Sequence, residues 1–573
     1  MSLANIFNPK RRIQGEKENT GHSAGPGAVR FYSKRMRGTE DPADNGDTGG
    51  KATNDPVKTT EEPVSNNFNE TGYPIVNEKI TFTVMHPQNP TNGPMEDMIY
   101  FQKLEEASNI GVVWEPVPAS DWDTKPSLTL AGGDLPDIVM GAVSNSTVYE
   151  YGIIGDYIVE ISEGIDKYMP NLKHWLNEYP DVYDSITQID GSIYFAPYIY
   201  DTAQAASDTV YLRMDFLRKA GIDKVPTTVD EFYDMLTAFK EANFAEDFAP
   251  MLPYRAANLT TGAVAAWLYP AFGESYDIIW GLGSEGKVEY TMINDQYKLY
   301  IEFISKLYAE GLIEPEIFTM DDQTNIAKMR ENKGAVLTYA TQLNPENFES
   351  GEYEVEIIPP LVSGHTSTQK IRSMPHYGGS AAFITKECEH VEAALRWFDM
   401  GYSVEDILPG LNHLSGWLGI RGYNWDFTDE TKQSVNYFIP EDLKEEAGNK
   451  TEAEFRVYRI APSMGPRAAV LWFIPESGGT KMKSEQSIMN LFPYMKESFP
   501  ASALKFTEEE NDVISNRFTD IETYVNQKLA KFIVGDEPMS NWDNYVAEVK
   551  RMGIDEVIEV YQASYDRLLE SRN

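Results

Sequence analysis

Alternation of apolar and polar residues begins near Ile75. Over 79–86 the period is two residues, which predicts a β-strand. Helical spacing follows over 95–108, then a second strand over 111–117, a short helix that closes at Gly133, and a short buried strand in LPDIVMG. Because strands that alternate with helices are typical of largely parallel sheets, this part of the chain predicts an α/β lobe.

The stretch 186–200 has β-rich runs on either side of Asp190 and Gly191. An Asp-Gly pair supplies the positive φ that a type I′ turn requires. We therefore expect this stretch to form a β-hairpin.

A second α/β unit is predicted from Asp208 onward. Thr228 has Glu231 three residues later, just before an apolar run, which is the signature of a capping box at a helix start. An amphipathic helix is expected over 297–311, where it ends at a glycine, and a strand over 334–340.

The strand-then-helix pattern returns after the second unit. A strand is predicted over 378–387 and a helix over 391–401. From Glu508 the chain is expected to be mostly helical, with helix caps at Ser540 and Asp555.

Charge narrows the classes of partner. Among 573 residues, Asp and Glu number 89 and Lys and Arg 49, a net charge of −40. Such a surface repels nucleic-acid phosphates and anionic lipids. The one cysteine, Cys388, rules out an intrachain disulfide. No apolar run is long enough for a membrane span, and the first residues lack the apolar core of a signal peptide.

Residues 1–72 have the composition of a disordered leader and tether. Residues 1–38 are basic, whereas 39–72 are acidic and rich in Gly, Pro, Asn, Thr and Asp. Neither part has enough large apolar residues to offset the entropy of the chain, so we expect neither to contribute to a core.

Motifs for cofactor or metal chemistry are absent from the sequence. GLGSEG at 281–286 fits the GxGxxG pattern, but a strand-like run follows it where a dinucleotide site needs a helix, so a glycine turn is expected. The seven histidines lack metal-ligand spacing, and Asp426–Glu430 is expected to be solvated surface. We expect no metal and no cofactor. With 89 acidic residues, spacing alone neither identifies nor rules out a glycosidase pair.

Aromatic residues make up 12% of the chain. Sugars present apolar C–H faces between rings of hydroxyls, so a sugar site needs flat aromatic surfaces with polar side chains beside them. Trp397 lies on an amphipathic helix face and is expected in the core. Tyr198, His376 and Trp425 have polar loop neighbours. The residues that we predict to bind ligand follow strands or lie in polar loops: Tyr200, Asp201, Arg255, Asn258, Tyr339, Tyr377, Trp417, Arg421 and Trp472.

Six sequence blocks from about Lys79 to the end resemble one family: LAGGDLPDIV, QIDGSIYFAPY, YLRMDFLRKAGIDKVPTTVDEFYDMLTAFKE, INDQYKLYIEFISKLYAEGLIEPEIF, FITKECEHVEAALRWFD and DIETYVNQKLAKFIVGDEPMSNWDNYVAEVKRMGIDEVIEVYQASYD. In this order they are similar to the extracellular solute-binding proteins (family 1 type) of carbohydrate ABC transporters, in particular their large lipoprotein branch. The resemblance implies a two-lobed α/β fold, the type II periplasmic-binding-protein-like fold. Each lobe would have a mostly parallel sheet flanked by helices, with the ligand cleft between the lobes.

We expect lobes that are discontinuous in sequence, because a strand-then-helix unit follows the second lobe. Lobe 1 is predicted to hold 75–197 and about 379–415. Lobe 2 is predicted to hold 198–378 and about 416–573, including the C-terminal helices.

The resemblance implies a non-enzymatic substrate-binding component of an ABC importer. It would capture a carbohydrate, most simply an oligosaccharide, and deliver it to membrane permease subunits, acting as a monomer outside the cytoplasm. The family is also lipid-anchored through a cysteine after a signal peptide, and this chain has neither. Two alternatives stay open: a glycan-active hydrolase or lyase, and a sensor ectodomain that binds a non-sugar solute.

Overall fold

The computed structural model describes residues 67–573 apart from 144, 201–208, 284, 340–342, 344–346, 348–351, 429–433, 470–473, 476–486, 488 and 573. The chain divides into Met1–Val64 and a compact unit, Ser65–Asn573. The description below concerns the second unit. Residues 1–66 of the expected leader lie outside the described residues.

The expected leader boundary at residue 72 is wrong. Phe68 forms a β-bridge with Val76. The guanidinium of Arg396 donates hydrogen bonds to the carbonyl oxygens of Asn69 (2.6 Å) and Gly72 (2.8 Å). Residues 67–72 have few apolar side chains. Their backbone carbonyls nevertheless bind to the fold, because the buried guanidinium of Arg396 needs hydrogen-bond acceptors. The ordered fold therefore begins by Asn67.

A six-stranded sheet forms the first layer, in the order β15-β4-β12-β3-β1-β2. Its strands are β1 (Ile80–Gln88), β2 (Ile110–Pro118), β3 (Ile138–Met140), β4 (Ala196–Tyr200), β12 (Tyr377–Ile384) and β15 (Arg467–Ala469). β12 is antiparallel to both of its neighbours, and the other pairs are parallel.

A four-stranded sheet has the order β10-β5-β9-β6. Its strands are β5 (Tyr211–Arg213), β6 (Ala249–Leu252), β9 (Gly334–Leu337) and β10 (Val355–Ile357). Here β5 is the one reversed strand. In each sheet the reversed strand is the first that the chain forms on arriving from the other sheet. The remaining strands share one direction, so both sheets are mostly parallel, as predicted.

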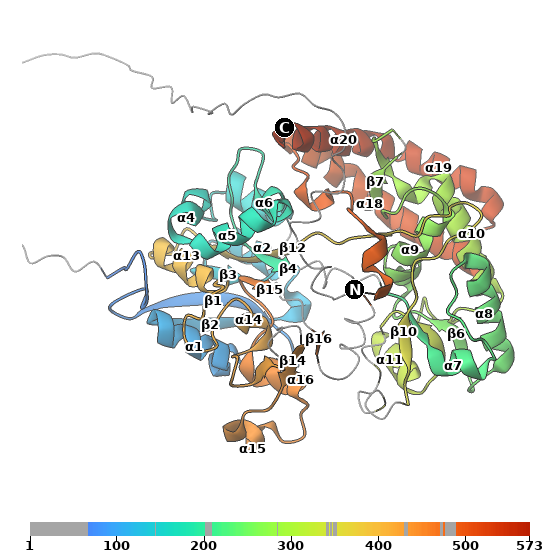
Figure 1. Cartoon of the computed structure of the whole chain (residues 1–573). Coiled ribbons are helices and arrows are strands. Elements are labelled where there is room, and N and C mark those ends of the chain that lie inside the picture. The colour runs from blue at the N-terminus through green and yellow to red at the C-terminus, as the bar shows by residue number, and fades with distance from the viewer. Residues whose placement is uncertain are drawn as a thin grey trace, which may run out of the picture. The chain divides into compact units, whose positions relative to one another are not determined.

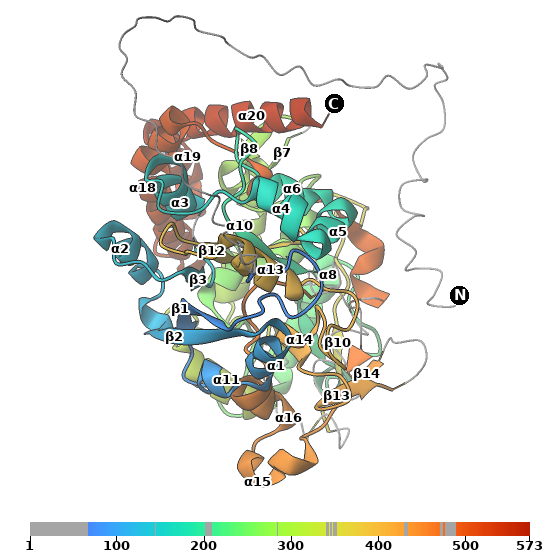
Figure 2. The same ribbon diagram turned by 90° about the vertical axis from the view of Figure 1, so that its left-hand side faces the viewer.

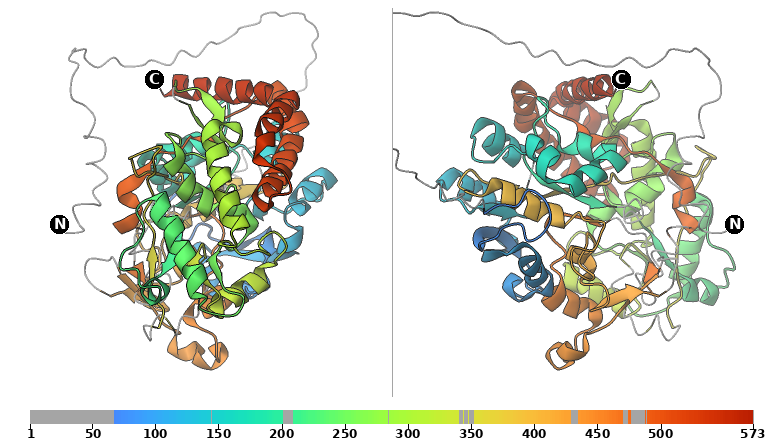
Figure 3. Two further views of the ribbon diagram at one scale, coloured as in Figure 1. Left: turned by 90° about the vertical axis from the view of Figure 1, so that its right-hand side faces the viewer. Right: turned by 60° about the vertical axis from the view of Figure 1, so that its left-hand side comes forward.

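Helices cover both sheets (Figure 1). Around the first sheet lie α1 (Ile99–Ser108), α2 (Lys125–Gly132), α4 (Ser162–Tyr168), α5 (Pro170–Glu178), α6 (Pro180–Ile186) and α13 (Val391–Met400). Around the second lie α7 (Met214–Lys219), α8 (Val229–Ala242), α9 (Ala263–Leu268), α10 (Asp295–Ala309) and α11 (Asp322–Arg330). The C-terminal helices α18 (Glu508–Val534), α19 (Trp542–Arg551) and α20 (Ile554–Ser571) pack together, and α18 contacts α10 (Figures 2 and 3).

Each sheet has its own hydrophobic core. The core of the first sheet includes Phe82, Ile199 and Trp397, and Trp397 is 3% exposed, which confirms its predicted place. The core of the second sheet includes Phe232 and Trp267 and extends into the C-terminal helices. The two cores share no residue, so the described unit has two lobes.

Two of the segments that connect the lobes pair with each other. β11 (Ile371–Arg372) runs parallel to β17 (Met495–Lys496), and the N–H of Ser373 donates to the carbonyl of Lys496 at 2.7 Å. The chain thus returns to the first sheet beside the segment that leads to the C-terminal helices.

Several local predictions are confirmed. α8 begins at Thr228 with a capping box, in which the N–H of Glu231 donates to Oγ1 of Thr228 at 3.1 Å. The glycine turn at 281–286 joins the antiparallel strands β7 (Trp280–Leu282) and β8 (Val288–Tyr290), with Gly286 at φ +72°.

The hairpin expected over 186–200 is wrong. α6 extends to Ile186, Gly191 lies at φ +87° in a tight turn, and the one strand is β4. The run before β4 bonds to the segment at 160–161 instead: the N–H of Ile161 donates to the carbonyl of Ile193 at 2.7 Å, and the N–H of Ile193 donates to the Glu160 carboxylate at 3.2 Å.

The caps expected at Ser540 and Asp555 are also wrong. α19 begins after Asn541, and α20 begins after Gly553, which lies at φ +101°. Asp555 instead lies in the first turn of α20, where its negative charge interacts favourably with the positive end of the helix dipole.

Candidate functional site

Two tyrosines lie at the carboxyl end of β4. The ring centroids of Tyr198 and Tyr200 are 4.2 Å apart, and both side chains are half-buried. They point to the same face because they are two residues apart, whereas Ile199 between them points into the core. Burial raises the pKa of Tyr200 to about 12, so its hydroxyl stays neutral and able to donate a hydrogen bond.

The two strands beside β4 contact this pair of rings. β15 runs parallel to β4 with Arg467 beside Tyr198, and the Arg467 guanidinium carbon lies 3.9 Å from the Tyr198 ring centroid. On the other side, Gly378 of β12 faces the rings: a Cβ there would collide with the Tyr200 ring. A glycine at this position therefore lets the tyrosines lie flat against the strand.

Trp417, in α14 (Ser415–Leu418), is connected to this region through its backbone carbonyl. Its side chain is partly buried against a small cluster that includes Leu414 and Trp425. Its carbonyl oxygen accepts a hydrogen bond from Nη1 of Arg456, which also donates to Oγ of Ser463 at 2.7 Å. The predicted ligand residues Tyr200 and Trp417 are thus linked through a shared group of arginines.

Tyr377 points the other way. It is paired across the sheet with Ile199, and its ring packs near Phe195 at 6.4 Å between centroids. Burial raises its pKa well above the usual range of tyrosine. Since paired residues of adjacent strands share a face, Tyr377 is on the core side of the sheet, which argues against a stacking role.

A second aromatic pair marks the other sheet. Tyr254 follows β6 and Tyr339 follows β9, and their ring centroids are 4.6 Å apart. Because β6 and β9 are parallel, both tyrosines lie at the carboxyl edge of the sheet, where ligands bind in open α/β sheets. Tyr339 is 36% exposed.

The predicted polar residues already have partners within the chain. Arg255 donates through Nε to Asp322 at 2.9 Å and lies over the ring of Tyr254. Oδ1 of Asn258 accepts from the N–H of Ala263 at 3.0 Å, at the start of α9.

Arg421 pairs with Asp406 at 2.7 Å. Asp201 and Trp472 lie outside the described residues. Of the other loop candidates, Trp425 is fully buried, and Nδ1 of His376 lies 3.0 Å from the carboxylate of Asp181.

Sequence patterns missed three residues of this site: Tyr254, Arg456 and Arg467. Tyr254 follows a strand by two residues, as Tyr339 does, so the same rule applied to β6 finds it. Arg456 and Arg467 carry no local signal, because only the pairing of β15 with β4 brings them to the tyrosines.

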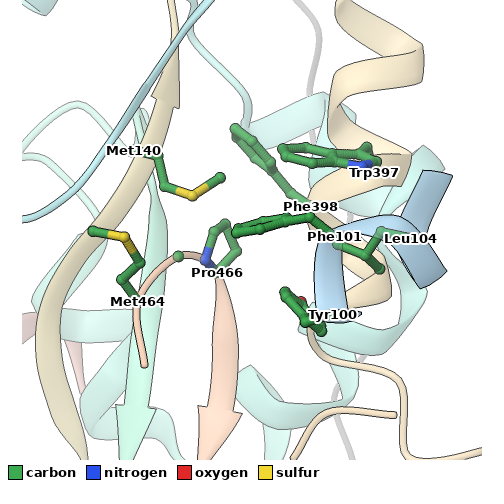
Figure 4. Close-up of a pocket in the computed structure, with 10 residues that line it drawn as sticks. Tyr100, Phe101, Leu104, Met140, Trp397, Phe398, Met464 and Pro466 are labelled. Carbon is green, nitrogen blue, oxygen red and sulfur yellow. The ribbon is translucent and has the colours of Figure 1, made fainter. Parts of the chain in front are cut away.

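Two hollows in the described residues are distinct from the tyrosines. Figure 4 shows an apolar crevice between α1, α13 and the segment before β15, lined by Phe101, Met140, Phe398, Met464 and Pro466 among others. Its volume of about 10 Å³ leaves room for a single water at most. An open groove of about 810 Å³, lined in part by Tyr423 and Phe438, contains none of the predicted ligand residues.

The described residues contain no group of three or more His, Cys, Asp or Glu side chains placed to hold a metal ion. Over the same residues, no helix has the length and apolarity to cross a membrane.

Two α/β lobes, linked by paired connecting segments and with aromatic pairs at a carboxyl edge of each sheet, define the class of two-lobed binding proteins. The chain belongs to the family of bacterial extracellular solute-binding proteins, which matches residues 90–406. These are binding proteins and not enzymes.

Relatives of known description agree with this class. The chain is 26% identical over 516 residues to the fructooligosaccharide ABC transporter substrate-binding protein FusA of Streptococcus pneumoniae serotype 4, covering 87% of this chain and 92% of FusA. It is 21% identical over 499 residues to the polygalacturonan/rhamnogalacturonan-binding protein YtcQ of Bacillus subtilis, and the match covers 84% of this chain and 89% of YtcQ.

The solved structures give the fold. FusA of S. pneumoniae in complex with kestose aligns with a TM-score of 0.68 at 24% identity, covering 86% of this chain and all of that one. The expected two-lobed type II fold is confirmed.

Proposed function

We propose that this protein is the substrate-binding component of an ABC importer, and that it captures an oligosaccharide between its lobes and delivers it to membrane permease subunits. The relatives FusA and YtcQ are named as saccharide-binding proteins, one of them of an ABC transporter. Their coverage of most of this chain supports the same role here.

The observation that carries the proposal is the aromatic pair on each lobe. Tyr198 and Tyr200 lie at the edge of one sheet, and Tyr254 and Tyr339 lie at the edge of the other. Partly exposed rings offer flat apolar surfaces to the C–H faces of sugar rings. With Trp417, they would supply enough stacking area for several sugar units, which favours an oligosaccharide over a monosaccharide.

The finer features of the proposal concern the lobes and the cell surface. We place lobe 1 at 75–197 with 379–415, and lobe 2 at 198–378 with 416–573, amended so that all of β4, β12 and β15 belongs to the sheet of lobe 1. We further propose that the protein acts as a monomer outside the cytoplasm, at the cell surface. Its one cysteine, Cys388, is buried and so is not available for a lipid anchor.

A panel of oligosaccharides tests the function. Thermal-shift screening followed by isothermal titration calorimetry should find at least one sugar that raises the Tm and binds with one-to-one stoichiometry. Mass spectrometry of the incubated sugar should show it unchanged, whereas cleavage products would support the hydrolase or lyase. If no sugar binds and a non-sugar solute does, the sensor ectodomain becomes the better explanation.

A further inference from the structure

Two arginines beside the aromatic rings of lobe 1 have no carboxylate partner among the described residues. Arg467 is 5% exposed and Arg456 is half-buried. Both hold the loop before β15: Nη2 of Arg467 donates to the carbonyl of Ser463 at 2.7 Å, and Nη1 of Arg456 donates to the hydroxyl of that residue at 2.7 Å. We call Arg456 and Arg467 the arginine pair.

Neutral groups accept all the hydrogen bonds that the arginine pair donates within the described residues. The acceptors are the carbonyls of Trp417, Ser463 and Gly465 and the Ser463 hydroxyl. Within that same part of the chain, neither guanidinium forms an ion pair with a carboxylate. Carbonyls satisfy N–H groups but leave the positive charge uncompensated, and a desolvated charge without a counter-ion is costly.

Three other cations that are buried or partly buried each pair with a carboxylate, whereas Arg396, like the arginine pair, donates to backbone carbonyls. Arg213 pairs with Asp215 at 2.7 Å, and Lys328 pairs with Glu314 at 2.9 Å. Arg459, three residues after Arg456, pairs with Glu446 at 3.1 Å. Acidic residues outnumber basic ones by 89 to 49, so a shortage of carboxylates does not explain the unpaired arginines.

The two charges also oppose each other. Burial, followed by the positive charge of Arg467, lowers the pKa of Arg456. Like charges held together in a half-buried site favour an anion, because an anion relieves both the repulsion and the desolvation.

Both arginines retain unused donors. Only Nη1 of Arg456 donates a hydrogen bond within the described residues, although a guanidinium has five N–H groups. Nε of Arg467 is buried without a hydrogen-bond partner. The free edge of Arg456 suits the two oxygens of a carboxylate or the oxygens of a sulfate.

The arginine pair is adjacent to the proposed sugar-stacking surface. Arg467 lies over the ring of Tyr198, which contacts Tyr200, and Arg456 holds the carbonyl of Trp417. A sugar ring stacked on these side chains would carry its substituents close to Arg456. FusA is named for fructooligosaccharides and YtcQ for polygalacturonan and rhamnogalacturonan. Membership of the family therefore does not decide whether the ligand of this chain is charged.

We propose that the oligosaccharide carries an acidic group, and that Arg456 binds this group while Arg467 supplies further positive charge behind it. The inference rests on the proposed function. It names the class of saccharide as acidic, with uronic acids and sulfated sugars as the two chemical sources.

Matched pairs of probes test the charge. Isothermal titration calorimetry of the full chain would compare trimers of galacturonate, mannuronate and glucuronate with their neutral methyl esters, and sulfated trisaccharides with their unsulfated forms. At least one acid should bind about tenfold more tightly than its neutral partner, and raised salt should reduce the difference.

Variants test the residue. Arg456→Gln should lose about tenfold more affinity for the acid than for its neutral partner. Arg456→Lys, which keeps the charge, should lose less. Arg459→Gln is the matched control, because it removes the same charge nearby from an arginine that already has a carboxylate partner.

The outcomes separate the two proposals. Equal binding of acids and esters, or an unchanged affinity in Arg456→Gln, overturns the acidic ligand and leaves the sugar receptor intact. Binding of no saccharide at all overturns both. If Arg456→Gln fails to fold, the comparison of acid and ester on the natural chain decides the question.

Discussion

At the scale of single residues, Tyr200 is the clearest case of a predicted ligand residue that the fold places well. Its half-buried ring contacts Tyr198 at the end of β4. We expect Tyr200→Ala to weaken sugar binding at least tenfold, since burial of a ring against a sugar contributes on the order of 1–3 kcal/mol. Calorimetry measures the affinity, and an unchanged circular dichroism spectrum checks the fold.

Tyr183→Ala is the control for this variant. Tyr183 is 46% exposed and belongs to α6, not to the strands β4, β12 and β15 that form the tyrosine site. Normal sugar binding by Tyr200→Ala would show that the end of β4 is not part of the binding site.

Asp277 gives the protein a predictable dependence on pH. It is buried, accepts a hydrogen bond from the N–H of Phe499 at 3.1 Å, and burial raises its pKa from 3.8 to about 7 against the effects of that bond and of Arg372. Between these values the folded chain keeps a proton that the unfolded chain releases. The stability from this group is therefore full below pH 3.8 and is lost as pH rises through about 7.

Asp277→Asn should remove this dependence. The Tm of the variant relative to the natural chain should rise as the pH goes from about 5 to about 8, because the natural chain alone loses stability by deprotonation. Scanning calorimetry at the two pH values measures the difference. An identical pH dependence in both chains would show that the carboxyl titrates normally.

At the scale of elements, the capping box of α8 is a local motif that acts as predicted. Thr228→Ala removes the acceptor for the N–H of Glu231 and should cost about 1 kcal/mol, seen as a lower Tm. Thr237→Ala, the same change in the middle of α8, should not lower the Tm, because alanine has the higher helix propensity. Equal effects of the two substitutions would contradict the capping role.

The segment 67–72 is a second element whose contribution can be measured. A chain that starts at Tyr73 lacks the carbonyls of Asn69 and Gly72 and leaves the guanidinium of Arg396 without these acceptors. Against a chain that starts at Asn67, we expect a loss of about 1–3 kcal/mol. Thermal melts compare the two, and coincident melts would mean that water replaces the carbonyls at no cost.

At the scale of the whole molecule, ligand binding should close the two lobes. The lobes have separate cores and are joined by short segments such as β11 and β17, so relative motion costs little core packing. Small-angle scattering with saturating sugar should show a smaller radius of gyration than without it. An unchanged profile, with binding proven by calorimetry, would place the sugar outside the region between the lobes.

Much of the fold follows from local patterns. The strands at 80–88 and 110–118, the capping box at Thr228 and the glycine turn at 281–286 depend on residues close in sequence, so periodicity and turn chemistry predict them. The same local rule selects Tyr200 and Tyr339, which lie at the carboxyl edges of the two sheets, and their contact with ligand stays a prediction.

Contacts between distant residues decided the rest. The hairpin at 186–200 fails because the run before β4 bonds to the distant segment around Ile161, and Tyr377 faces the core because it pairs with Ile199. The arginine pair reaches the tyrosines only through β15, which joins a strand more than 260 residues earlier in the chain. The free energies of local conformational preferences are small beside those of core packing and strand pairing. Residue patterns therefore predict helices, strands and candidate aromatic residues, whereas only the tertiary structure brings the two arginines to the tyrosines.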